Sequence, residues 1–135
     1  MIKAEVIADS KNKFGNRIVT MIVTMPRYIL AEFNTHRMFS RNSASSRAIP
    51  FKKMMDSVLQ NPFIPIAWME DHKGMQGSKY ITDLNKIKEL ERLWLQARSN
   101  AVERAEQMNR LGLTKQMCNR PMEAFMWHTV YVPVS

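Results

Sequence analysis

Residues 35–47 read THRMFSRNSASSR, and their composition sets them apart from the rest of the chain. The stretch combines arginines, a histidine, an asparagine and five hydroxyl side chains with only three apolar residues, Met38, Phe39 and Ala44. Arginine presents a planar fork of hydrogen-bond donors that matches phosphate or carboxylate oxygens, and hydroxyl groups can complete the shell around such an anion. The stretch therefore predicts a binding site for a phosphate-bearing ligand.

The order of these residues resembles the signature of the flavin-dependent thymidylate synthases, the ThyX family, whose pattern is R-H-R-x-x-S-x-N-E-x-S-x-R-Y. Six polar positions of that pattern are matched in register: His36, Arg37, Ser40, Asn42, Ser45 and Arg47. Three positions depart from it: Thr35 stands for an arginine, Ser43 for a glutamate and Ala48 for a tyrosine. The GMQG turn at residues 74–77 is similar to the phage-type branch of the family.

The resemblance implies the reaction and its cofactors. ThyX enzymes methylate deoxyuridine monophosphate (dUMP) reductively at its C5 carbon, with methylenetetrahydrofolate as the one-carbon donor, FAD as the hydride carrier and NADPH as the reductant. It also implies a homotetramer with flavin sites shared between subunits. Family members continue into a further helix, whereas this sequence ends at Ser135, so we expect a single ThyX-like domain over residues 1–135 that lacks the family's C-terminal segment.

The same resemblance assigns residues to each ligand. The residues implied for flavin binding are Thr35, His36, Arg37, Asn42 and Ser43. Those implied for dUMP binding are Glu32, Ser43, Ala44, Ser45, Ser46, Arg47 and Arg120. Arg120 lies in residues 115–130, KQMCNRPMEAFMWHTV, which are similar to the family's region before its last strand; as a surface helix arginine it could equally have no ligand.

Chemical reasoning from the residues adds a role for Arg47 and limits the others. A guanidinium group binds phosphate through two parallel hydrogen bonds and stays charged at any working pH, which makes Arg47 the candidate phosphate ligand. No neighbouring base is visible in the sequence to activate Ser45 as a nucleophile, so we expect it to bind only. We assign no catalytic nucleophile and no metal site.

Bulk properties restrict the class of protein. The single cysteine, Cys118, excludes an internal disulfide and a cysteine-rich zinc site, and we expect it to be a small, semi-buried apolar residue on a helix. The first residues do not read as a secretory signal, and no run of eighteen apolar residues occurs, so we expect a cytoplasmic protein without a membrane span.

The charge of the chain leaves three functional classes open. The net charge is +8, and residues 27–53 contain six Lys or Arg residues against one acid, Glu32. Such an excess repels itself unless an anion or another subunit offsets it. A small phosphorylated ligand is the interpretation that we favour; a nucleic-acid-binding module is less favoured because no recognised nucleic-acid motif is present. A non-catalytic ThyX-like fragment is the third alternative.

Hydrophobic periodicity predicts three strands and three longer helices. Residues 2–8 and 17–25 are predicted strands joined by a turn at 10–16, and residues 125–134 are a predicted strand that Pro133 would interrupt. A short helix is expected from Arg27, and further helices at 51–59, 83–111 and 114–124. Residues 38–50 and 61–80 are expected to be loops, the second unusually long.

The helix at 83–111 dominates this prediction. Thr82 or Asp83 can cap its start, and Gly112 follows its end. Apolar residues recur along it every three or four positions: Leu84, Ile87, Leu90, Trp94, Ala97, Ala101, Ala105 and Met108. At roughly 43 Å it would be longer than a small core requires, so we expect part of it to pack against another subunit. The predicted fold class is α+β, a small β-sheet packed against this long helix.

Overall fold

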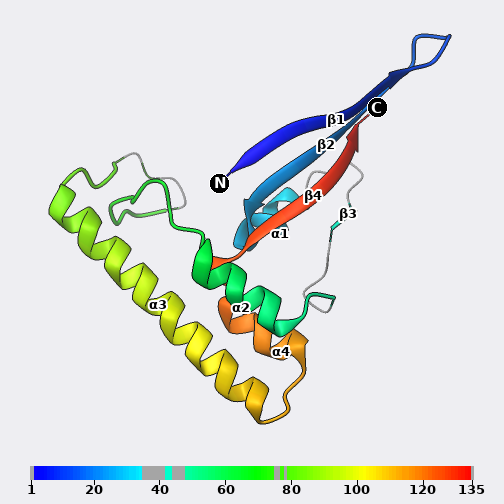
Figure 1. Ribbon diagram of the computed structural model, residues 1–135. Coiled ribbons are helices and arrows are strands. Elements are labelled where there is room, and N and C mark those ends of the chain that lie inside the picture. The colour runs from blue at the N-terminus through cyan, green and yellow to red at the C-terminus, as the bar shows by residue number, and fades with distance from the viewer. Residues whose placement is uncertain (1, 35–41, 44–47, 75–76, 78, 135) are drawn as a thin grey trace.

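The computed structural model describes residues 2–34, 42–43, 48–74, 77 and 79–134, and for Asn42 and Ser43 it describes the backbone alone. The elements in chain order are β1 (Lys3–Lys11), β2 (Arg17–Pro26), η1 (Arg27–Ile29), α1 (Leu30–Phe33), β3 (Asn42–Ser43), α2 (Phe51–Gln60), α3 (Leu84–Arg110), α4 (Lys115–Asn119), η2 (Arg120–Phe125) and β4 (Trp127–Val134). Figure 1 shows the sheet at one end of the molecule and α2, α3 and α4 at the other. The α+β class is confirmed.

β1 and β2 form an antiparallel hairpin whose turn is held by asparagine and glycine. The side-chain oxygen of Asn12 accepts hydrogen bonds from the backbone N–H groups of Phe14 and Asn16, at 2.9 and 3.0 Å. Gly15 has a φ of +87°, a backbone conformation that residues with a Cβ atom rarely adopt. The hairpin predicted from this turn is confirmed, and it projects from the body as an arm (Figure 1).

β4 connects this hairpin to the rest of the sheet, whose strand order is β1-β2-β4-β3. It pairs antiparallel with β2 along its whole length, so the predicted interruption at Pro133 is wrong. In the described residues β3 pairs with β4 only at Val130 and Tyr131, which leaves Pro133 beyond that pairing. At such an edge the missing N–H of proline can face away from the ladder.

One face of the sheet is buried beneath η1 and α1. Met25, Val130 and Val132 are at most 4% exposed. The half-buried side chains packed against them are Val23, Ile29, Leu30, Phe33 and Val134. The short helix expected from Arg27 therefore exists as η1 followed by α1, and its apolar side fixes it on the sheet.

A second core forms where the helices meet. α2 contributes Phe51, Met54 and Val58, which are spaced one helical turn apart, and α3 contributes Val102 and Ala105. α4 and η2 complete this core with buried apolar side chains, namely Cys118, Met122 and Phe125. The helical position predicted for the single cysteine is confirmed, and its burial is complete where the prediction was partial burial.

The single helix predicted at 114–124 is instead an α-helix followed by a 3-10 helix. Thr114 begins α4, and its hydroxyl accepts a hydrogen bond from the backbone N–H of Met117 at 3.4 Å. Pro121 then occupies the first turn of η2. Proline has no N–H to donate to the preceding turn, so the regular α-helix ends at Asn119.

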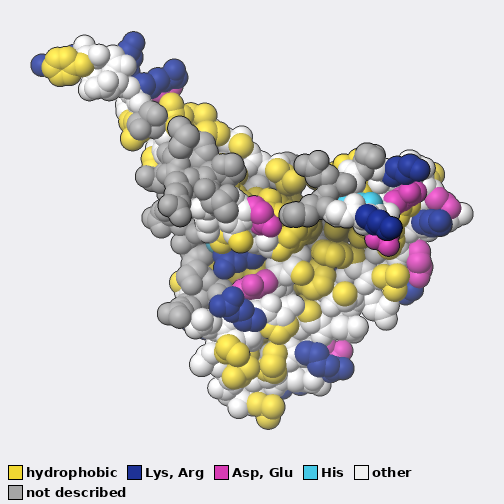
Figure 2. Space-filling model, turned by 180° about the vertical axis from the view of Figure 1, so that it is seen from behind, with side chains coloured by type: hydrophobic (Ala, Val, Ile, Leu, Met, Phe, Trp, Pro, Cys, Tyr) yellow, Lys and Arg dark blue, Asp and Glu magenta, His cyan; other side chains and the backbone are white. Residues whose placement is uncertain are grey.

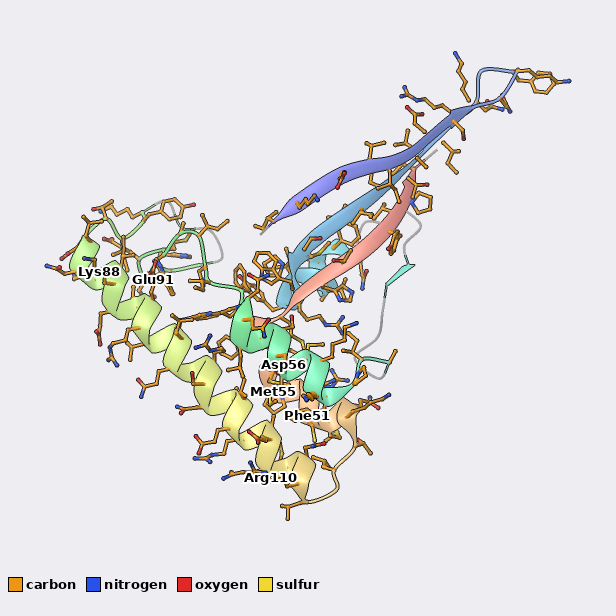
Figure 3. All side chains as sticks on the ribbon, viewed as in Figure 1. Phe51, Met55, Asp56, Lys88, Glu91 and Arg110 are labelled. Carbon is orange, nitrogen blue, oxygen red and sulfur yellow. The ribbon has the colours of Figure 1, made fainter. Side chains whose placement is uncertain are left out.

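α3 begins and ends where the sequence predicted. The Asp83 carboxylate accepts a hydrogen bond from the N–H of Asn85 at 2.9 Å, and Gly112 adopts φ +87° just past the end. Its buried side chains are confined to the C-terminal half, while Leu84 is 72% exposed and Ala97 is also exposed, so these two members of the apolar stripe lie outside the core of the chain itself. The reason is that the N-terminal half extends beyond α2 and α4, as the positions of the labelled α3 side chains show (Figure 3).

An aromatic cluster joins α3 to the sheet. The Phe63 ring contacts Trp94 of α3 and Trp127 of β4 edge-on, with centroid separations of 6.2 and 5.3 Å. The Trp94 indole N–H donates to the backbone carbonyl of Phe63 at 2.7 Å, and Trp68 packs on Trp94. The long loop at 61–80 is thus held against the body at Phe63 and Trp68. Among the described helices, none is long and apolar enough to cross a membrane.

Candidate functional site

The motif segment is the name used here for residues 35–47. It follows α1, contains β3 and is followed by α2. Seven of the predicted site residues lie outside the described residues: Thr35, His36, Arg37, Ala44, Ser45, Ser46 and Arg47. Their roles remain predictions. Glu32 and Arg120 are described with their side chains, and Asn42 and Ser43 by their backbone.

The start and middle of the motif segment are tied to the sheet. α1 ends at Phe33, whose half-buried side chain packs against the core of the sheet, and Asn34 follows as the C-terminal cap. Further along, Asn42 lies opposite Tyr131 and Ser43 opposite Val130 in the β3–β4 pair. The sequence placed Asn42 and Ser43 in a loop, and this is corrected, because β4 supplies backbone partners that the local sequence cannot reveal.

The end of the motif segment is tied to the helical core. Ile49, two residues after Arg47, packs against the core cluster that contains Phe51 and Met122. The side-chain amide of Asn119 donates to the backbone carbonyl of Ile49 at 3.3 Å. The motif segment therefore runs from the sheet to the helices, with anchor points before, within and after it.

Arg120 follows Asn119 directly, so the structure brings it close to the end of the motif segment. Its side chain is 54% exposed, and one guanidinium nitrogen lies 3.4 Å from a carboxylate oxygen of Glu123. Guanidinium has five N–H donors, so this single contact leaves it able to bind an anion as well. η2, which carries Arg120, lies against η1, the short helix that leads into α1.

Glu32 is exposed on α1. Glu32 is three positions before Thr35, where the motif segment begins. Glu32 thus belongs to the helical piece η1–α1, which precedes the motif segment. Arg120 belongs to α4–η2, which contacts the chain just after the motif segment through Asn119 and Ile49. Figure 2 shows basic and acidic side chains lying near one another on the body of the molecule below the arm.

A contact that the sequence analysis missed lies at the junction of these pieces. Arg27, the first residue of η1, places one guanidinium nitrogen 3.1 Å from Nδ1 of His128 and 3.4 Å from its Nε2. His128 is 6% exposed. Burial, and then the charge of Arg27, lower the pKa of His128 to about 4, so the ring is neutral near pH 7 and can accept from the guanidinium.

The signal for His128 was present in the sequence. It alternates with Val130 and Val132, and in a strand such residues share a face, so it had to point toward the same interior. Its partner could not be foreseen, because Arg27 is 101 residues away along the chain. The pair holds η1, and therefore α1, to the start of β4. The backbone N–H of Arg27 also donates to the carbonyl of Met126, the residue before β4, at 2.8 Å.

The described residues contain no cluster of three or more His, Cys, Asp or Glu side chains able to hold a metal ion. Cys118 is fully buried, and burial raises the pKa of its thiol. A buried thiol with a raised pKa carries little thiolate at neutral pH, and the thiolate is the nucleophilic form. We therefore assign no nucleophilic role to Cys118.

The fold is shared with an enzyme that acts on pyrimidine nucleotides. No protein-family model matches the sequence, and no curated protein matches it. Two solved structures of a UMP/dUMP methylase PolB from Streptomyces cacaoi do match by structure. The structure bound with 5-Br UMP has a TM-score of 0.75 at 14% identity and is matched over 100% of this chain and 71% of that chain. The structure bound with 5-Br dUMP has a TM-score of 0.75 at 13% identity, over 100% of this chain and 73% of that one. At such identities the likeness shows the fold.

Proposed function

We propose that this chain binds dUMP and supports its flavin-dependent methylation at C5 to give dTMP, using methylenetetrahydrofolate, FAD and NADPH. The observation that carries the proposal is the placement of the motif segment. Its described neighbours are α1 before it and the chain that leads into α2 after it, and Asn42 and Ser43 within it pair with β4, in a fold shared with a UMP/dUMP methylase. The ThyX-like order of polar residues at 35–47 and the nucleotide chemistry of the structural neighbour support the proposal separately, because the first is a feature of the sequence and the second belongs to a protein that shares the fold at 14% identity.

The nucleotide is bound at the end of the motif segment in this proposal. Arg47 binds the phosphate through a paired set of N–H donors, with hydroxyl and backbone donors of residues 43–46 around it. Arg120 approaches from η2, whose first turn adjoins Ile49 through Asn119. Glu32 contributes an acceptor from α1, which suits the N–H of a uracil ring.

The flavin is bound by the beginning and middle of the motif segment. Thr35, His36, Arg37 and Asn42 form a donor-rich, cationic set, which fits a pyrophosphate and a reduced, anionic ring. Ser43 replaces a glutamate of the family pattern, and loss of one hydrogen bond to a charged group weakens binding by about 1.5 to 3 kcal/mol. The chemistry that FAD supplies when bound is transfer of hydride derived from NADPH.

The protein itself supplies no covalent nucleophile in this proposal. The single cysteine is inside the helical core and its pKa is raised, so it is unsuited to the attack on C6 of the uracil ring that cysteine-dependent methylation of dUMP requires. The cofactors therefore carry the difficult chemistry, and the residues of the chain bind and orient the reactants.

We also propose that the chain works as a homotetramer. β1 is exposed along its whole length, and exposed apolar side chains occur on the arm, among them Ile2, Val6 and Phe14. Exposed apolar side chains also occur in the N-terminal half of α3, among them Leu84 and Leu93, as expected for a helix longer than its own core needs. Sedimentation equilibrium measures the assembly: a single species of four chains supports this part of the proposal, and a monomer contradicts it.

The experiment that tests the function follows the release of tritium from C5 of labelled dUMP in the presence of methylenetetrahydrofolate, FAD and NADPH. The wild-type chain is compared with Arg47→Ala and with Arg104→Ala, which removes an equally charged, exposed arginine from α3. Release by the wild type and by Arg104→Ala, with none by Arg47→Ala, supports the proposal. Absence of release from the wild type, together with salt-sensitive binding to a single-stranded oligonucleotide, would favour the nucleic-acid-binding alternative instead.

A further inference from the structure

Asn119 links α4 to the chain that leaves the motif segment. Its side chain is 0% exposed, and its Nδ2 atom donates to the backbone carbonyl of Ile49 at 3.3 Å. The two residues are 70 positions apart, so this is a tertiary contact and not part of a local turn. Burying an amide costs free energy unless it is hydrogen-bonded, and a fully buried asparagine among apolar side chains therefore calls for an explanation.

The carbonyl group that accepts this hydrogen bond lies directly before the start of α2. Ile49 packs against the helical core, and Pro50 is the N-terminal cap of α2, with its own carbonyl accepting from the N–H of Met54 at 3.1 Å. The carbonyl of Ile49 precedes that helix and is outside its hydrogen-bond ladder. Ile49 is only two positions after Arg47, a span of at most about 7 Å.

Asn119 is also the residue before Arg120. The end of α4 therefore does two things at once: it holds the backbone at Ile49 and it starts the turn that presents the Arg120 guanidinium to solvent. Whatever fixes Ile49 relative to this turn also limits how far the chain at residue 47 can move from Arg120. A buried apolar residue at position 119 would fill the same space, but without the hydrogen bond it would not fix the distance between Ile49 and the turn that carries Arg120.

We propose that Asn119 is a positioning residue for the nucleotide site, which holds the chain after Arg47 at a fixed distance from Arg120. This inference rests on the proposed function, because it assigns both arginines to the nucleotide. Asn119 acts through Ile49 and touches no reactant. Its contribution is to orient binding groups in advance, so that the nucleotide does not have to order them.

The test uses the isosteric variant Asn119→Asp together with the core variant Val102→Ala. At about pH 7.5 an aspartate carboxylate has no proton to donate to the Ile49 carbonyl, whereas a protonated carboxyl group does. Burial raises the pKa of a carboxyl group, so the donor returns in mild acid. Val102 belongs to the same helical core and is 5% exposed, so Val102→Ala lowers the melting temperature without removing a hydrogen bond.

The measurement is the dissociation constant of dUMP by isothermal titration calorimetry, with melting temperatures recorded for every variant. We expect Asn119→Asp to bind dUMP roughly tenfold more weakly than the wild type at about pH 7.5, and the ratio to fall below about twofold near pH 5. Val102→Ala is expected to keep the affinity of the wild type at both pH values.

Equal affinities of Asn119→Asp and the wild type at about pH 7.5 would overturn the inference while leaving the proposed function intact. Equal weakening by Val102→Ala would also overturn it, because the effect would then be one of general stability. A wild-type chain that does not bind dUMP would overturn the proposed function, and this inference with it.

Discussion

Mild acid is expected to destabilise the protein through His128. The ring is 6% exposed and lies 3.1 Å from the guanidinium of Arg27, and burial and that charge lower its pKa from 6.5 to about 4. In the unfolded chain the pKa returns to about 6.5. Between about pH 6.5 and 4 the histidine is protonated in the unfolded state but neutral in the folded state. The contribution of this group to the free energy of unfolding is therefore fully present above about pH 6.5 and is lost as the pH drops toward 4. These two pKa values correspond to a loss of about 2 kcal/mol between pH 7.5 and 5.

Urea unfolding followed by circular dichroism at several pH values measures this loss. The variant His128→Gln keeps a hydrogen-bond acceptor for Arg27 but cannot titrate, so its stability should change with pH by about 2 kcal/mol less than that of the wild type over the same interval. His72→Gln, at an exposed histidine, should retain the dependence of the wild type. If His128→Gln and the wild type lose the same free energy between about pH 7.5 and 5, the reasoning about the buried ring is wrong.

Three further substitutions test the core, a helix cap and the motif. Met122→Ala removes a side chain that is 0% exposed in the helical core and should cost about 3 kcal/mol by urea unfolding; a cost within the range of a surface substitution would refute the packing described. Asp83→Ala removes the cap of α3 and should cost about 1 kcal/mol, whereas Asp83→Asn should cost little, and equal melting temperatures for both would contradict the capping role. Arg47→Ala should weaken dUMP binding about 100-fold or more by calorimetry with an unchanged melting temperature, and unchanged affinity would remove its assignment to the phosphate.

Much of the fold could be predicted because its signals are local. The turn at residues 10–16, the Asp83 cap and the glycine after α3 each act on the chain within a few residues, and the structure has all three. The errors came where a distant partner decides the outcome. Pro133 stays in β4 because β2 pairs with it, and Asn42 and Ser43 form a strand because β4 supplies their backbone partners.

The candidate site divides in the same way. The motif segment could be found from the order of its polar side chains, because that order is a property of neighbouring residues and needs no tertiary contact to be recognised. Asn119 and Arg27 could not be found, because their importance comes from contacts with Ile49 and His128, 70 and 101 residues away. A buried asparagine and an inward-facing histidine become noticeable only when tertiary contacts are known.

The most direct test of the central claim, that the motif segment forms a joint flavin and nucleotide site, is the visible absorbance spectrum of the protein titrated with FAD and then with dUMP. The account predicts a bound-flavin spectrum that changes again when dUMP is added, and loss of that second change in Arg47→Ala. If the FAD spectrum stays that of free FAD when the protein and then dUMP are present, the claim is contradicted.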